Sequence, residues 1–185
     1  MSKLITQINA MDKDWKERIS AHWWATNYTG SISEIKDADK LLKLRDKLVE
    51  LGGEECCMPF GDEDIDRILD RGELLIPEPI NNQQKKYMVD YLEYIGEASQ
   101  CHANSAELYW NNRNNKELTM DVRICTGYAL TDDGMWRQHS WIILIDRFNN
   151  EIDTVIETTL KRVAYYGVVL TIEECEEFCS HYNWL

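Results

Sequence analysis

Basic residues are scarce in this 185-residue sequence, in which 20 Lys and Arg stand against 33 Asp and Glu and give a net charge of −13. Phosphate backbones attract basic surfaces, so the composition disfavours a nucleic-acid-binding protein. No apolar run approaches the roughly 18 residues that cross a bilayer. Near the start, Asp12, Lys13 and Asp14 interrupt the segment that would be apolar in a signal peptide. We therefore expect a soluble, cytoplasmic protein that binds neither nucleic acid nor membrane.

The sequence also lacks a Gly-rich phosphate-binding loop, internal repeats and low-complexity tracts. Hydrophobic residues make up 44% and charged residues 29%, which is typical of a globular protein with a sizeable core. The six cysteines are even in number, but without an export signal we expect reduced thiols. Each cysteine is therefore judged by its surroundings: 56, 57, 101, 125, 175 and 179.

Residues 1–78 predict a helical N-terminal region. Apolar residues three or four apart indicate a helix over 4–24, and a Leu-rich helix follows a capping box formed by Ser31 and Glu34. Gly52 and Gly53 are expected to end that helix, and a short helix is expected over 63–69. The Pro-containing segment 76–82 is typical of an extended boundary.

Residues 79–185 predict an α+β core, either separate from the first part or forming one compact unit with it. Helices are expected over 83–96, over 101–110 and after the capping box of Thr171 and Glu174. Alternating or branched residues predict antiparallel strands, which follow the second helix in a meander. Their ranges are 117–130, 139–146, 151–159 and 162–170.

Cys101 stands where a polar segment, GEASQ, meets the helix predicted over 101–110. The free N–H groups and the dipole of a helix N-terminus lower the pKa of a thiol, and the same N–H groups can bind an oxyanion. These properties favour a nucleophile, although a buried core thiol is the commoner role of a cytosolic cysteine.

His139 begins the predicted strand 139–146, and Trp141 faces the same side of that strand. The next strand carries two acids on one face, Asp153 and Glu157. In adjacent antiparallel strands either carboxylate can lie beside His139, fix its tautomer and support its charged form. His139 would then be the base that a nucleophilic thiol requires.

The segments CHANSAEL, ICTGYAL, HSWIILID and VIETT follow one another in this order within residues 96–160. Together they resemble the transglutaminase-like branch of the papain-like cysteine hydrolases. The resemblance implies a cysteine-bearing helix packed on an antiparallel sheet. It also implies that Cys101 is the nucleophile, His139 its base and Glu157 the acid that orients His139, and that no metal or cofactor is required.

The chain departs from the family pattern at the acid, where Glu157-Thr158-Thr159 replaces Asp-Pro-Thr. Asp153 therefore stays open as the alternative acid. His102 is not expected to be the base, because neighbouring helical residues point about 100° apart. We expect the Cys101 N–H and the Gln100 side chain to stabilise the oxyanion, and Trp141 to line the substrate site.

Two functions follow. The first is a cysteine-dependent hydrolase or acyltransferase that acts on an amide or peptide-type bond of a protein or peptide. The alternative is a non-catalytic binding protein on the same fold, whose acidic surface mimics DNA or inhibits a basic protein partner. Cys175, Cys179 and His181 could begin a zinc site, but their helical spacing favours core positions, so we expect no metal.

Overall fold

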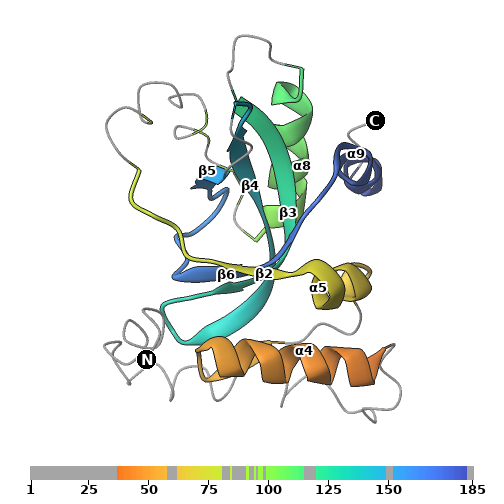
Figure 1. Cartoon of the computed structure of the whole chain (residues 1–185), viewed down its shortest axis with the longest axis vertical. Helices are drawn as coiled ribbons and strands as arrows, with labels where there is room; N and C mark the ends of the chain where they lie inside the picture. Colours follow the sequence, from red (N-terminus) through yellow and green to blue (C-terminus); the bar gives the residue numbers. More distant parts are fainter. Residues whose placement is uncertain are drawn as a thin grey trace. The chain divides into compact units, whose positions relative to one another are not determined.

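The computed structural model describes residues 37–57, 62–80, 99–114, 120–148 and 152–182, together with positions 84, 91, 94, 96 and 97. Its architecture is α+β, with four helices and one mixed sheet among these residues (Figure 1). In chain order the elements are α4 Ala38–Leu51, β1 Glu55–Cys57, α5 Ile65–Arg71, β2 Glu73–Leu75, α8 Cys101–Asn112, β3 Met120–Leu130, β4 Met135–Asp146, β5 Ile152–Ile156, β6 Ala164–Val169 and α9 Ile172–His181.

The chain divides into two compact units. The first takes in the described residues up to Ile76 together with Gly127–Gln138 and Arg162–Tyr166, and the second comprises Pro77–Thr126, His139–Lys161 and Gly167–Leu185. Strands β3, β4 and β6 therefore contribute residues to both. The segments 127–138 and 162–166 lie late in the sequence but belong to the first unit. A division of the chain at residue 78 would assign both segments to the second part.

The sheet has the order β1-β4-β3-β6-β2, and β5 pairs with β4 off this path. β1 pairs with β4 in parallel, with Cys56 opposite Trp136, so the expectation of a purely antiparallel sheet is wrong. The expectation that residues 1–78 are helical is also wrong at β1 and β2. Each of these strands has three residues, which is too short for an alternating pattern to be seen in the sequence.

In the first unit, α4 buries Leu41, Leu44 and Leu48, which lie three or four residues apart. The helix ends as expected at Gly52, which has a φ of 142°, followed by Gly53 with a φ of 91°. Position 53 requires glycine, because a Cβ on Gly53 would lie 2.9 Å from the Trp136 indole nitrogen.

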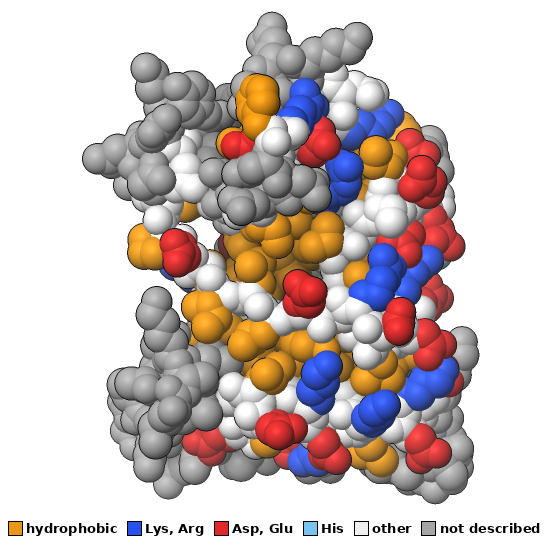
Figure 2. Space-filling model, in the orientation of Figure 1, with side chains coloured by type: hydrophobic (Ala, Val, Ile, Leu, Met, Phe, Trp, Pro, Cys, Tyr) orange, Lys and Arg blue, Asp and Glu red, His pale blue; other side chains and the backbone are white. Residues whose placement is uncertain are grey.

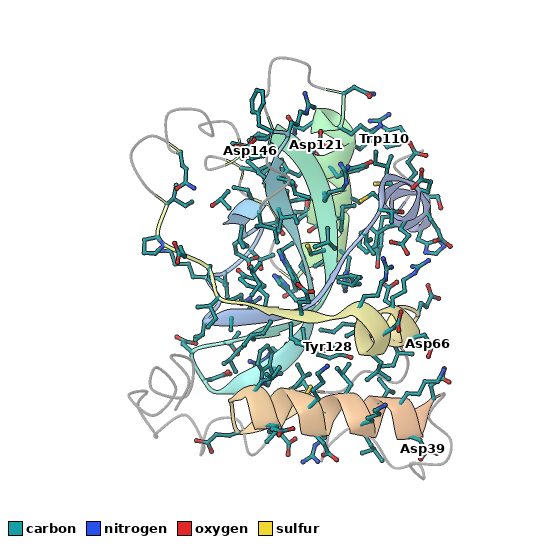
Figure 3. All side chains as sticks on the ribbon, in the orientation of Figure 1. Asp39, Asp66, Trp110, Asp121, Tyr128 and Asp146 are labelled. Carbon is teal, nitrogen blue, oxygen red and sulfur yellow. The ribbon has the colours of Figure 1, made fainter. Side chains whose placement is uncertain are left out.

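β3 and β4 form a hairpin whose turn, closed by hydrogen bonds of Thr131 and Gly134, belongs to the first unit, while Met120–Thr126 and His139–Asp146 belong to the second. Figure 3 shows Asp121 near the start of β3 and Asp146 at the end of β4, both at the same end of the hairpin. Helix α8 lies along these strands, and α9 contacts α8 (Figure 1). Cys101 at the start of α8 and His139 within β4 therefore both belong to the second unit.

Helix α9 begins with the predicted capping box. The Thr171 hydroxyl accepts from the Glu174 N–H at 3.2 Å, and the Glu174 carboxylate accepts from the Thr171 N–H at 2.9 Å. Cys175 and Cys179 are both fully buried, which confirms them as core positions. Among the described residues, no group of His, Cys, Asp and Glu could hold a metal ion.

Three predictions lie outside the described residues, namely the helix over 4–24, the capping box of Ser31 and Glu34, and most of the helix over 83–96. Within the part of the chain that the structure describes, no helix has the length and hydrophobicity to cross a membrane. On the face shown in Figure 2, acidic side chains lie among Lys and Arg side chains and do not form one acidic block.

Candidate active site

Cys101 is the first residue of α8, and the chain enters this helix through a strained turn. Ser99 has a φ of 62°, in the left-handed region that costs a residue with a side chain roughly 1 kcal/mol. Gln100 follows as the N-cap residue, and its side chain does not cap the helix. The thiol is only partly buried, and its sulfur accepts hydrogen bonds from the backbone N–H groups of His102 and Ser140. This placement confirms the predicted helix start at Cys101.

His139 lies within β4 and forms hydrogen bonds to both Cys101 and Glu157. Its Nε2 lies 3.0 Å from each carboxylate oxygen of Glu157. Because Nε2 contacts Glu157, the other ring nitrogen, Nδ1, remains for Cys101. The imidazole is 2% exposed, so both hydrogen bonds are shielded from water. The structure thus brings Cys101, His139 and Glu157 into one chain of contacts.

The pairing of β4 with β5 explains why Glu157 reaches His139. Ile142 pairs with Ile156, so the next residue, Glu157, falls opposite Trp141 and diagonal to His139 on one face of the sheet. Diagonal neighbours are about 7–8 Å apart, a distance that a long side chain can span. The extra methylene of glutamate therefore suits this register.

Asp153, the alternative acid, is placed elsewhere by the same pairing. Asp153 lies at an irregularity in the pairing of β4 with β5. Leu144 pairs with Thr154 and the next residue, Ile145, pairs with Ile152, so the pairing skips position 153. Leu144 and Ile145 lie five and six positions beyond His139, which at about 3.3 Å per residue is more than about 15 Å along the strand.

The Glu157 carboxylate is held by its own turn. Oε1 accepts from the Thr159 N–H at 2.9 Å and from the Thr159 hydroxyl at 3.0 Å. These bonds hold the carboxylate that contacts His139, so the imidazole meets an oriented acceptor. Thr159 was not among the predicted site residues, although the Thr-Thr pair after Glu157 could have indicated it.

The pKa values of Cys101 and His139 shift in opposite directions. Burial is the largest influence on Cys101 and raises its pKa, but the hydrogen bond and charge of His139 outweigh it, so the pKa of the thiol lies below its ordinary value. Burial likewise lowers the pKa of His139, but its bonds to Cys101 and Glu157 raise it above its ordinary value overall. Both shifts favour a thiolate paired with an imidazolium.

The other five cysteines behave differently, and all of them lie within the described residues. Burial is the first cause at each and raises the pKa, to about 12 at Cys175 and about 11 at Cys179. It also raises the pKa of the remaining three: Cys56, Cys57 and Cys125. Cys101 is therefore the one cysteine of the six whose surroundings favour the thiolate.

Two further predicted residues lie close to this chain of contacts but are placed differently. Gln100 is exposed, and its amide donates to the Glu97 carboxylate at 2.5 Å. Trp141 is 2% exposed, and its ring is parallel to the His139 ring with centroids 6.3 Å apart. Trp141 thus supports the imidazole from within the core and offers little surface to a substrate.

Asn104, on the same helix as Cys101, is a structural residue of the site that sequence reasoning missed. Its Oδ1 accepts from the Glu97 N–H at 3.1 Å, and its Nδ2 donates to the Glu97 carbonyl at 2.8 Å and the Thr158 carbonyl at 3.3 Å. Asn104 thereby ties α8 to the segment before Cys101 and to the turn after Glu157.

Comparison of the chain with protein-family models, with curated proteins and with solved structures gives no match.

Proposed function

We propose that this protein is a cysteine-dependent hydrolase or acyltransferase that acts on an amide or peptide-type bond, on a papain-like or transglutaminase-like core. The observation that carries the proposal is the chain of contacts from Cys101 through His139 to Glu157, at the only cysteine with a lowered pKa. A thiolate beside an imidazolium that is in turn oriented by a carboxylate is the arrangement that thiol nucleophiles use.

In the first half of the reaction, the Cys101 thiolate attacks the carbonyl carbon of the substrate amide and forms a tetrahedral intermediate. The negative charge on the carbonyl oxygen is stabilised by N–H groups at the start of α8. The His139 imidazolium gives its proton to the leaving nitrogen, the C–N bond breaks and an amine departs. The products are a thioester on Cys101 and a neutral imidazole on His139.

In the second half, His139 takes a proton from the incoming nucleophile, which then attacks the thioester carbonyl. With water the released product is a carboxylic acid, and with an amine it is a new amide. The C–S bond breaks, and the thiolate and the imidazolium are restored. Glu157 accepts a hydrogen bond from Nε2 throughout and stabilises the positive ring each time it forms.

Selective alkylation tests the proposal. Iodoacetamide should label Cys101 ahead of the other five cysteines at pH 6.5, with the labelled peptide identified by mass spectrometry. The labelling rate should fall as the pH drops through the lowered pKa of the thiol, because only the thiolate reacts. His139→Ala should slow labelling at pH 6.5 by about tenfold or more, since it removes the opposite charge.

A matched control is His181→Ala, at an exposed histidine of α9. It should leave the rate at Cys101 unchanged. Equal labelling of all six cysteines in the wild-type protein, or an unchanged rate in His139→Ala, would contradict the assignment of Cys101 as nucleophile.

A further inference from the structure

His102, the second residue of α8, contacts the strand that carries His139. Its Nδ1 lies 2.5 Å from the hydroxyl of Ser140, which is fully buried. Consecutive residues of the helix therefore bind consecutive residues of the strand: Cys101 contacts His139, and His102 contacts Ser140. His102 is not expected to be the base, and its contact with Ser140 gives it a different place in the site.

The Ser140 hydroxyl is held from two sides. Besides His102 it contacts the hydroxyl of Thr126 on β3, to which it donates at 3.4 Å. A hydroxyl has one proton, so with that proton directed to Thr126 the Nδ1–H of His102 is the donor to Ser140. The buried side chain of Ser140 is thus fixed by a helix on one side and by the neighbouring strand on the other.

The backbone of Ser140 takes part in the site itself, because its N–H donates to the sulfur of Cys101. Ser140 also directly follows His139 in β4. A rotation of the Ser140 peptide would therefore move the N–H away from the sulfur and turn the His139 ring relative to Glu157. A displacement of about 1 Å is enough to weaken such contacts.

The orientation of the His102 ring is set by the last helix of the described chain. The Tyr182 ring stacks on the His102 ring, with ring centroids 5.8 Å apart and ring planes 17° apart. The centroid of the Phe178 ring lies 6.1 Å from that of the His102 ring. The Cys179 thiol of α9 donates to the Ala106 carbonyl of α8 at 3.6 Å, so these rings are held against the helix that carries His102.

We propose that His102 is a positioning residue, which fixes Ser140 so that the Ser140 N–H stays on the Cys101 sulfur and His139 stays aligned with Cys101 and Glu157. This inference rests on the proposed function of Cys101. His102 reaches the reacting atoms through Ser140.

Three variants test the proposal through the pH profile of Cys101 alkylation. His102→Phe retains a ring for Tyr182 and Phe178 but loses the nitrogen, Ser140→Ala loses the hydroxyl, and the third variant combines both changes. Each single variant should slow iodoacetamide labelling at pH 6.5 by about threefold to tenfold, the effect expected from the loss of one hydrogen bond. The pH profile of labelling should also shift to higher pH. The double variant should match the slower single variant, because both changes remove the same interaction.

His181→Phe, the same substitution at an exposed position of α9, is the control and should retain the wild-type profile. His102→Asn, which keeps a nitrogen donor near the Nδ1 position, should recover most of the rate. A wild-type profile in His102→Phe and Ser140→Ala, or single effects that simply multiply in the double variant, would overturn the proposal.

If His102→Phe does not fold, as judged by circular dichroism, Ser140→Ala and His102→Asn test the proposal by themselves. Slow labelling of Cys101 in Ser140→Ala together with near-normal labelling in His102→Asn supports the proposal. Any other pair of results opposes the proposal. Failure of the proposed function is recognised separately, because the wild-type protein would then label all six cysteines equally.

Discussion

His139 holds two partners at once, the thiol of Cys101 and the carboxylate of Glu157, and the site depends on both contacts. The carboxylate favours the charged ring, and the charged ring favours the thiolate, so a change at Glu157 is transmitted to a sulfur that it does not touch. The ring is nearly inaccessible to water, and the low local dielectric strengthens both interactions.

Glu157→Gln should therefore reduce the reactivity of Cys101. The amide keeps the shape of the side chain but removes the charge, which lowers the pKa of His139 and raises that of Cys101. We expect alkylation of Cys101 at pH 6.5 to slow by about tenfold, which corresponds to about one pKa unit. Measurement of labelling rates between pH 5 and pH 9 checks the shift.

The matched control for Glu157→Gln is Asp153→Asn, at the acid that the strand register places away from His139. Its labelling profile should equal that of the wild-type protein. Slow labelling in Asp153→Asn with normal labelling in Glu157→Gln would make Asp153 the orienting acid.

Thr159 supplies two of the hydrogen bonds on Glu157, one from its backbone and one from its hydroxyl. Thr159→Val keeps the side-chain shape and the backbone bond and removes only the hydroxyl. We expect a loss of about 1 kcal/mol in the free energy of unfolding, measured by urea denaturation. Thr159→Ser, which retains the hydroxyl, should lose less, and a larger loss in Thr159→Ser would argue against the hydrogen bond as the cause.

At the scale of elements, Asn104 joins three segments of the second unit. The amide on α8 bonds to both backbone groups of Glu97 and to the carbonyl of Thr158. Gly96 makes this approach possible, because a Cβ there would lie 2.3 Å from the Asn104 amide nitrogen and 2.7 Å from the Thr158 carbonyl oxygen. The turns on either side of the site are thus positioned by one asparagine.

Asn104→Ala should destabilise the protein by about 1–3 kcal/mol, because it leaves buried backbone groups without their bonds. Asn112→Ala is the matched control, since the Asn112 amide donates only within its own helix, to the Leu108 carbonyl at 2.8 Å. Urea denaturation of both variants measures the difference. Equal stability of the two variants would show that the links made by Asn104 contribute little.

At the scale of the whole molecule, the first unit contains segments from three parts of the chain. Trp136 of β4 is fully buried within it, and its indole N–H donates to the Gly52 carbonyl at 2.5 Å. Tyr128 of β3 is also buried and donates to the Asp62 carboxylate at 3.0 Å (Figure 3). Both aromatic residues come from strands, β4 and β3, that also contribute residues to the second unit.

A fragment of residues 77–185 should therefore not fold as the full chain does. Removal of α4, β1, α5 and β2 exposes Trp136 and Tyr128, so we expect the fragment to bind a hydrophobic dye and to lack the cooperative urea transition expected of the full chain. Tryptophan fluorescence and dye binding measure both effects. A fragment with a sharp transition and a buried tryptophan would show that the second unit folds alone.

The sequence by itself determined the helix start at Cys101, the strand that carries His139, the capping box of Thr171 and Glu174 and the α+β class, because local periodicity and capping residues specify such features. It also indicated Cys101 and His139 as site residues, with Glu157 or Asp153 as the acid beside them. It could not decide between Glu157 and Asp153, because an irregularity in strand pairing leaves no local signal.

Only the tertiary structure decided which groups meet. The strand register separates Asp153 from His139, and the short strands β1 and β2 join the sheet through backbone hydrogen bonds that their three residues do not encode locally. The contacts of His102 with Ser140 and of Asn104 with Thr158 join residues 38 and 54 positions apart. Such contacts depend on how helix and sheet pack together, which local sequence patterns do not specify.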